Sequence, residues 1–96
     1  MSWQVSIRKE AQVDLLRARE WYDQIDRELG DRFLDEVSVA MQELAQDPLI
    51  PSLYYRDFRR ILLKKFPYKV FYQVIDQRVI VFRVLHAHEC HESRLD

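Results

Sequence analysis

The sequence predicts an α+β fold of the order β-α-α-β-β-β, in which a helical hairpin packs on an antiparallel sheet of about four strands. Two observations lead to this prediction. The first 48 residues pass from a short alternating stretch to two segments with apolar residues at helical spacing. The stretch from Phe58 to His86 is instead dominated by Val, Ile, Phe, Tyr and Leu, with breaks at Phe66-Pro67 and Ile75-Asp76-Gln77. Three consecutive antiparallel strands are the simplest structure for such a stretch.

The length and composition fit one compact domain over residues 1–96. Hydrophobic residues make up 48% of the chain and charged residues 32%, which excludes a disordered protein. A single cysteine cannot form an internal disulfide, so nothing indicates secretion. No apolar run has the length of a signal peptide or of a membrane span, which needs roughly 20 residues. We therefore expect a cytoplasmic protein.

The first half of the chain predicts one strand and two helices. Residues 3–7 alternate apolar and polar, as in a half-buried strand. Apolar residues then recur on one helical face at Ala11, Leu15, Ala18, Tyr22, Ile25 and Leu29. We expect Gly30 to end this helix as a C-cap and Asp31 to begin the next. The second helix carries its apolar face at Phe33, Val37, Ala40, Met41 and Leu44 and ends at Asp47-Pro48.

The second half predicts an irregular connection over residues 49–57 and then the three strands. In the strand before Phe66-Pro67, cations alternate with apolar residues as far as Lys64 and Lys65. In the last strand, alternation predicts one face with Val79, Val81, Arg83 and Leu85 and another with Ile80, Phe82, Val84 and His86.

The charges are segregated along the chain. Residues 1–48 hold 6 Lys/Arg and 11 Asp/Glu, a net charge of −5, whereas residues 49–96 hold 9 and 5, a net charge of +4. Six cations and one acid lie between Arg56 and Lys69. A basic sheet surface of this kind suits a polyanion or an acidic protein, although a solvated sheet face explains the same pattern. The predicted partner-binding residues are Arg59, Arg60, Lys64, Lys65, Tyr68, Lys69 and Arg83.

Other chemistry is less well supported. The chain has no Gly-rich phosphate loop and no convergent pair of carboxylates, so we expect neither a nucleotide cofactor nor a Mg²⁺-dependent nuclease. The segment HAHECH places His86 and His88 on the same side if it is extended, and Cys90 and His91 follow. Imidazoles and a thiolate can bind zinc, but this spacing matches no structural zinc pattern, so we expect no metal. A histidine here could also transfer a proton near neutral pH.

These elements, the helix ending LAQDP, the Arg59-Arg60 strand and the segment FPYKVFYQVIDQRVIVFRVLHAH resemble the RelE/ParE superfamily of toxins from bacterial type II toxin–antitoxin modules. The resemblance covers nearly the whole chain and is closest to the ParE-like branch, whose members are often called plasmid-stabilisation proteins. It implies a toxin that a cognate antitoxin neutralises, with DNA gyrase as the target. Such a toxin acts by binding and needs no cofactor.

The RelE branch implies an alternative, a metal-independent mRNA endonuclease that acts on the ribosome. In this chain Arg60, Lys64 and Lys69 would stabilise the scissile phosphate, and His86 or His88 would shuttle a proton. This branch has an arginine near position 90 and a tyrosine after it, and the chain has neither. Their absence favours the hypothesis of a ParE-like toxin. It also has Glu89-Cys90 where ParE-like members have an Arg-Asp pair, so a third possibility is a toxin fold that has lost toxicity.

Overall fold

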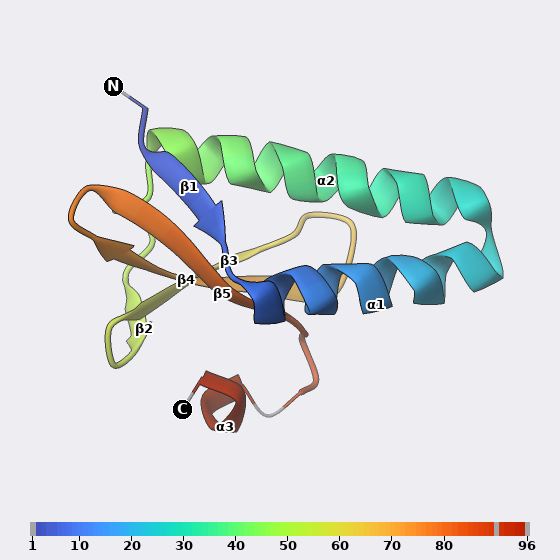
Figure 1. Cartoon of the computed structure of the whole chain (residues 1–96). Helices are drawn as coiled ribbons and strands as arrows, with labels where there is room; N and C mark the ends of the chain where they lie inside the picture. Colours follow the sequence, from blue (N-terminus) through green and yellow to red (C-terminus); the bar gives the residue numbers. More distant parts are fainter. Residues whose placement is uncertain (1, 90, 96) are drawn as a thin grey trace.

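The computed structural model describes residues 2–89 and 91–95 (Figure 1). Its elements follow the order β1 (Gln4–Ile7), α1 (Lys9–Ile25), α2 (Arg27–Gln46), β2 (Leu53–Tyr55), β3 (Phe58–Leu62), β4 (Tyr68–Ile75), β5 (Arg78–His86) and α3 (His91–Leu95). The strands form one sheet in the order β1-β5-β4-β3-β2. Strand β1 pairs parallel with β5, and all other pairs are antiparallel. The predicted fold is confirmed, with one more strand than expected.

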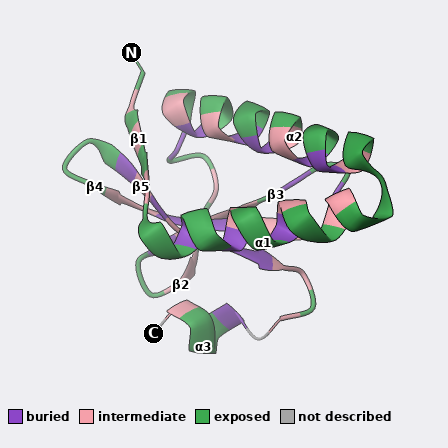
Figure 2. Ribbon diagram, turned by 45° about the vertical axis from the view of Figure 1, so that its right-hand side comes forward, coloured by how far each residue is buried: buried purple, intermediate pink, exposed green. Residues whose placement is uncertain are grey.

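The sheet separates two layers of unequal size. Helices α1 and α2 form an antiparallel hairpin on one face, the helix-covered face, and the short helix α3 lies on the opposite, outer face (Figure 1). The core lies between the hairpin and the sheet, where the buried sides of both helices turn inward (Figure 2). Its largest fully buried side chains include Tyr72, Phe33 and Leu44. Across the described residues, no helix combines the length and apolar character that a membrane span requires.

The helical hairpin turns earlier than predicted, at Asp26 instead of Gly30. Asp26 has an extended backbone, and its Oδ1 accepts a hydrogen bond from the backbone N of Glu28 at 2.9 Å, so it caps α2. Gly30 lies buried inside α2, where a Cβ atom would overlap the carboxylate of Asp23 in α1. The C-cap at Gly30 and the N-cap at Asp31 are therefore wrong. The glycine allows the two helices to approach closely.

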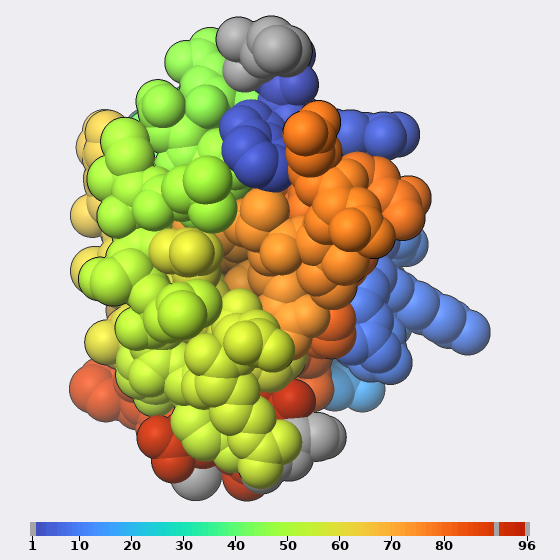
Figure 3. Space-filling model, turned by 90° about the vertical axis from the view of Figure 1, so that its left-hand side faces the viewer, coloured from blue at the N-terminus to red at the C-terminus, as the bar shows by residue number. Residues whose placement is uncertain are grey.

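The segment expected to be irregular contains strand β2. Leu53 pairs with Arg59 and Tyr55 with Phe58, and Arg56 takes the intervening turn with a positive φ of 52°. In Figure 3 this part of the chain (yellow-green) runs down the surface from the end of α2 (green) toward α3 (red). The sequence did not reveal β2 because three residues are too few for a periodic pattern.

A bulge in β5 changes the predicted faces of the last strand. Phe71 pairs with Arg83 and Tyr72 with Val81, so Phe82 is an additional residue without a partner in the ladder. Val84 consequently lies in the same core as Val81, although strict alternation placed the two on opposite faces. The prediction for the faces of this strand is therefore correct only as far as the bulge.

Candidate functional site

Two of the predicted cations, Arg60 and Lys69, lie on the outer face of the sheet. Val70 belongs to the core under the helices, and its neighbours in β4 point the other way because side chains alternate along a strand. Arg60 is paired with Phe71 in the ladder and so shares that outer face. Its guanidinium carbon lies 3.8 Å from the ring centroid of Tyr54, a cation–π contact. This face therefore presents two cations beside an aromatic ring.

Lys64 and Lys65 are not on the sheet, because β3 already ends at Leu62. The Nζ of Lys64 lies 3.7 Å from Oε1 of Glu43, and the backbone N of Lys65 donates a short hydrogen bond to the Glu36 carboxylate. Both acids belong to α2. The two lysines thus stand in the β3–β4 connection, beside the helix and away from the outer face.

Arg59 is engaged inside the molecule. Its Nη1 donates to the carbonyl oxygen of Pro51 at 2.6 Å, and the hydroxyl of Tyr72 donates to the carbonyl of Pro48 at 2.8 Å. Burial raises the pKa of Tyr72 to about 12, an effect that the charge of Arg59 partly opposes. These two side chains from neighbouring strands together fix the connection between α2 and β2.

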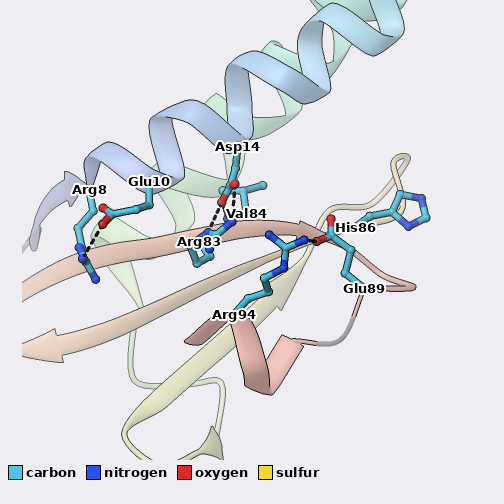
Figure 4. Close-up of polar contacts among 8 residues, drawn as sticks. All are labelled: Arg8, Glu10, Asp14, Arg83, Val84, His86, Glu89 and Arg94. Carbon is cyan, nitrogen blue, oxygen red and sulfur yellow. Dashed lines mark hydrogen bonds and ion pairs between the residues drawn. The ribbon is translucent and has the colours of Figure 1, made fainter. Parts of the chain in front are cut away.

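Arg83 is also engaged, by Asp14 of α1 (Figure 4). The Arg83 Nε and Nη2 donate to the two Asp14 oxygens at 2.7 and 2.9 Å, and the backbone N of Val84 donates to Asp14 Oδ2 at 3.0 Å. The side chains are 18% and 8% exposed. The hydrogen bonds to Asp14 raise the pKa of Arg83, although its burial acts in the opposite direction.

The structural role of Asp14 was not predicted, because an acidic residue near the start of a helix is already explained by its favourable interaction with the helix dipole. A signal was present: Asp14 lies on the helical side that also carries Ala11 and Ala18, where an apolar residue is expected. Strand β1 ends at Ile7, so the edge of β5 beyond Val81 lacks a neighbouring strand. The Asp14 carboxylate accepts the hydrogen bond that a strand would otherwise take.

Tyr68 lies on the opposite side of β4 from Lys69. Its ring centroid is 5.3 Å from that of Phe33 and 6.2 Å from that of Tyr22, within an aromatic cluster under the helices. Burial raises the pKa of Tyr68, and the charges of Tyr22 and Glu89 raise it further. The tyrosine therefore packs against the hairpin, on the face of the sheet opposite Lys69.

The five residues of the mRNA-cleavage hypothesis are distributed over different parts of the molecule. Arg60 and Lys69 share the outer face, but Lys64 lies in the β3–β4 connection. The ring of His86 packs against that of Tyr68 at 5.3 Å, so it points away from Lys69. His88 lies in the turn after β5 and is exposed. Two of the five side chains are thus on one surface.

A groove beside α2, which the sequence did not indicate, encloses about 540 Å³. Its apolar lining comes from Leu29 and Val39 of the helix and Phe66 of the β3–β4 connection. A smaller hollow continues it along the end of β3 to Leu62, which is 61% exposed. The charged side chains that surround the groove are Arg32, Asp35, Glu36, Lys64 and Lys65. We call this feature the α2 groove.

The histidine segment is not extended beyond His86. His88 lies in a turn, and its ring centroid is 5.2 Å from that of His86, while His91 begins α3. Among residues 2–89 and 91–95, no three His, Cys, Asp or Glu side chains are arranged to hold a metal ion. Cys90 lies outside the described residues.

The match to a family model and the similarity to solved structures agree with the resemblance found in the sequence. The family model of the ParE toxin of the type II toxin–antitoxin system parDE matches residues 5–89 of the chain. No curated protein matches the sequence. Among solved structures, the chromosomal ParDE toxin–antitoxin system from P. aeruginosa aligns with a TM-score of 0.81 at 13% identity and covers 91% of this chain and 98% of that chain.

Two further structures have the same fold. The RelBE2 toxin–antitoxin complex from Mycobacterium tuberculosis aligns with a TM-score of 0.64 at 20% identity, over 90% of this chain and 99% of that chain. A mutant of the E. coli toxin RelE in the free state aligns with a TM-score of 0.70 at 23% identity, over 95% and 90% of the two chains. At these identities the likeness establishes the shared fold.

Proposed function

Because the chain belongs to the ParE toxin family of type II toxin–antitoxin systems, we propose that it arrests growth by binding and poisoning DNA gyrase and that a cognate antitoxin neutralises it. The gyrase target follows from the resemblance to ParE-type toxins. The structures of relatives from P. aeruginosa and M. tuberculosis are of toxin–antitoxin systems, which supports an antitoxin partner.

The observation that most favours binding over RNA cleavage is the separation of the five candidate catalytic residues. Charge stabilisation in a transition state requires donors that converge within hydrogen-bond distance of one reacting group. Here Lys64 pairs with Glu43 beside α2, and His86 packs on Tyr68 under the helices. Only Arg60 and Lys69 remain on a common face, which is enough to recognise an acidic protein surface.

We propose the α2 groove as the antitoxin site. Its apolar floor suits the apolar side of an amphipathic segment. Lys64 and Lys65 stand at its rim, where they can pair with acids of the partner. Arg59, Tyr68 and Arg83 contact other parts of the chain. We therefore expect them to support the structure of the binding surfaces and not to contact a partner themselves. The outer face, with Arg60 and Lys69, is then left for gyrase.

A supercoiling assay tests the proposed target. Purified toxin added in excess to gyrase and relaxed plasmid should inhibit supercoiling and trap cleaved DNA, and the antitoxin should reverse both effects. Unimpaired supercoiling would contradict the proposal. If supercoiling is unimpaired, overexpression in cells distinguishes the two remaining explanations. A toxin with a different target still arrests growth, whereas a chain that has lost toxicity does not.

The shared position of Arg60 and Lys69 keeps mRNA cleavage as a second candidate. Primer-extension mapping on translating ribosomes distinguishes the two functions. Cuts in the ribosomal A site that Lys69→Ala or Lys64→Ala abolishes would indicate the endonuclease. Gyrase poisoning predicts no such cuts in the presence of either the wild-type chain or its variants.

A further inference from the structure

A pocket of about 280 Å³ lies between α1, β5 and α3. It forms at the edge of the sheet, because β1 pairs with β5 only as far as Val81 and leaves the rest of that edge without a strand. Its lining includes the buried residues Ala18 and Val84 and, on α1, Arg17 and Trp21. We call it the Trp21 pocket. Pockets for small organic ligands begin at about 300 Å³, so it has room for one ligand of modest size.

Arginines neutralise both acids of the Trp21 pocket. The two oxygens of Asp14 accept hydrogen bonds from Arg83, at 2.7 and 2.9 Å. Oε2 of Glu89 lies 3.4 Å from Nη2 of Arg94, which extends from α3 (Figure 4). Arg17 differs from these two arginines, because none of the described residues forms an ion pair with it. Three arginines and two acids give the pocket a net charge of +1, which favours an anion.

The two arginines available to an anion come from different elements. Arg17 lies on α1, and Arg94 lies on α3 with its side chain 50% exposed. A guanidinium carries five N–H donors, so the contact with Glu89 leaves Arg94 donors for a second acceptor. Arginine binds phosphate through pairs of parallel N–H donors. Because side chains and not backbone N–H groups would contact the phosphate, such a site needs no Gly-rich loop.

Trp21 gives the pocket a flat aromatic surface. It is 60% exposed, whereas tryptophan side chains are highly buried on average. The next residue, Tyr22, packs on Phe33 and Phe66 with ring centroids 5.5 and 4.9 Å apart. Trp21 instead lies one turn beyond Arg17 on the same side of α1. An exposed indole beside a cation is a surface on which a nucleic-acid base can stack.

The combination of an indole with arginines selects one class of ligand. An inorganic anion would use the arginines alone, and an uncharged aromatic compound would use the indole alone. We propose that the Trp21 pocket binds a nucleoside phosphate, with the base on Trp21 and the phosphate between Arg17 and Arg94. A second hollow, which shares Arg17 with this pocket and extends to Lys9, offers a path along α1 for a longer strand. The inference goes beyond the proposed function, because it involves neither gyrase nor an antitoxin.

Tryptophan fluorescence tests this binding. The variant Trp3→Phe leaves Trp21 as the one tryptophan of the chain. Adenosine 5′-monophosphate should quench its fluorescence to saturation, and adenosine, which lacks the phosphate, should bind about tenfold more weakly. Equal binding of the two compounds, or no saturable quenching by the monophosphate, would overturn the proposal. If Trp3→Phe is unstable, the indole N–H signal of Trp21 in the NMR spectrum of the wild-type chain gives the same measurement.

Calorimetric titration of variants assigns the binding to the pocket. Arg17→Ala and Trp21→Leu should each weaken binding of the monophosphate about tenfold. Both side chains are exposed, so we expect both variants to fold. Arg27→Ala is the matched control, because it removes an equally exposed arginine at the start of α2. The proposal fails if Arg17→Ala binds as tightly as Arg27→Ala does.

A short oligoadenylate distinguishes the two sources of a nucleoside phosphate. If the pocket holds part of a nucleic-acid strand, the oligomer should bind more tightly than the monophosphate, and Lys9→Ala should remove that advantage. If the pocket holds a free nucleotide, the two should bind equally and Lys9→Ala should have no effect. An oligomer that binds equally well to the Arg17→Ala and wild-type chains would place nucleic-acid binding outside the pocket and contradict the proposal.

Discussion

Two groups of cations that look alike in the sequence have different surroundings in the structure. Arg59 and Arg83 are bound by the chain itself, to the carbonyl of Pro51 and to Asp14. The lysines of the β3–β4 connection are exposed at the rim of the α2 groove. The planar, multidentate guanidinium suits fixed internal contacts, whereas a flexible ammonium suits an exposed rim. Charge segregation along a sequence therefore overestimates the charge that a partner can meet.

Removal of the Asp14 carboxylate should have the largest effect on the internal group. Asp14→Ala leaves the Arg83 guanidinium and the Val84 N–H without their partner in a buried site, and we expect a loss of about 3 kcal/mol in the free energy of unfolding. Urea denaturation measures it. A loss below about 1 kcal/mol would show that Arg83 is as dispensable as an exposed cation.

The double variant Asp14→Leu, Arg83→Met serves as the matched control. It removes both charges and keeps apolar volume, so it should be more stable than Asp14→Ala. If it is less stable, the site depends on the charges themselves, and the comparison between bound and exposed cations needs another explanation.

Tyr72→Phe tests the second internal contact, next to Arg59. Loss of the hydrogen bond from the hydroxyl to Pro48 should cost about 1 to 1.5 kcal/mol. The pKa of Tyr72 is raised from 10.0 to about 12, so its neutral form favours the folded state. That stabilisation is complete below pH 10 and declines as the pH rises toward 12. The free energy of unfolding, measured at increasing alkaline pH, should decline less in the variant than in the wild type. An equal decline in both would mean that other ionisable groups cause it.

A substitution in the β4–β5 turn should change the free energy of unfolding without involving either group of cations. Asp76 and Gln77 have φ values of 49° and 63°, a left-handed pair without a glycine. Gln77→Gly should raise the free energy of unfolding by about 0.5 to 1 kcal/mol, because a two-residue hairpin of this kind favours glycine. Thermal unfolding checks the sign. A lower melting temperature would indicate that the Gln77 side chain contributes more than its backbone strain costs.

Replacement of the exposed lysines should have the smallest effect on stability and a clear effect on recognition. The ion pair between Lys64 and Glu43 is exposed, so Lys64→Ala should change the free energy of unfolding by less than about 0.5 kcal/mol. Lys64→Ala with Lys65→Ala should weaken antitoxin binding, and wild-type affinity should fall with added salt. Calorimetric titration at two ionic strengths measures both. Affinity that is independent of salt would remove the electrostatic part of the proposal.

The sequence predicted the elements that repeat a pattern over many residues. The apolar faces at Phe33 and Val37 in α2 lie where the periodicity placed them. The break predicted at Ile75-Asp76-Gln77 contains the turn, although Ile75 still belongs to β4. The helix boundary was misplaced because a single glycine has two explanations, a left-handed cap or a close approach. Gly30 serves the second, and only the position of Asp23 reveals it.

The positions of the candidate site residues were harder to predict because they depend on the pairing register of the strands. One additional residue at Phe82 moves Val84 to the helix-covered face, and the early end of β3 takes Lys64 off the sheet. The contact between Asp14 and Arg83 joins residues that are far apart in the chain, and no local pattern shows such a pair. The α2 groove likewise depends on how α2 packs beside the β3–β4 connection.

The central claim, that the two surfaces have different partners, is tested most directly by gyrase inhibition measured on two charge-reversal variants. Arg60→Glu with Lys69→Glu changes the outer face, and Lys64→Glu with Lys65→Glu changes the rim of the α2 groove. We predict that the first variant no longer inhibits supercoiling but still binds antitoxin, and that the second inhibits like the wild type but escapes neutralisation. Equal loss of gyrase inhibition in both folded variants, or inhibition retained by the first, would contradict the account.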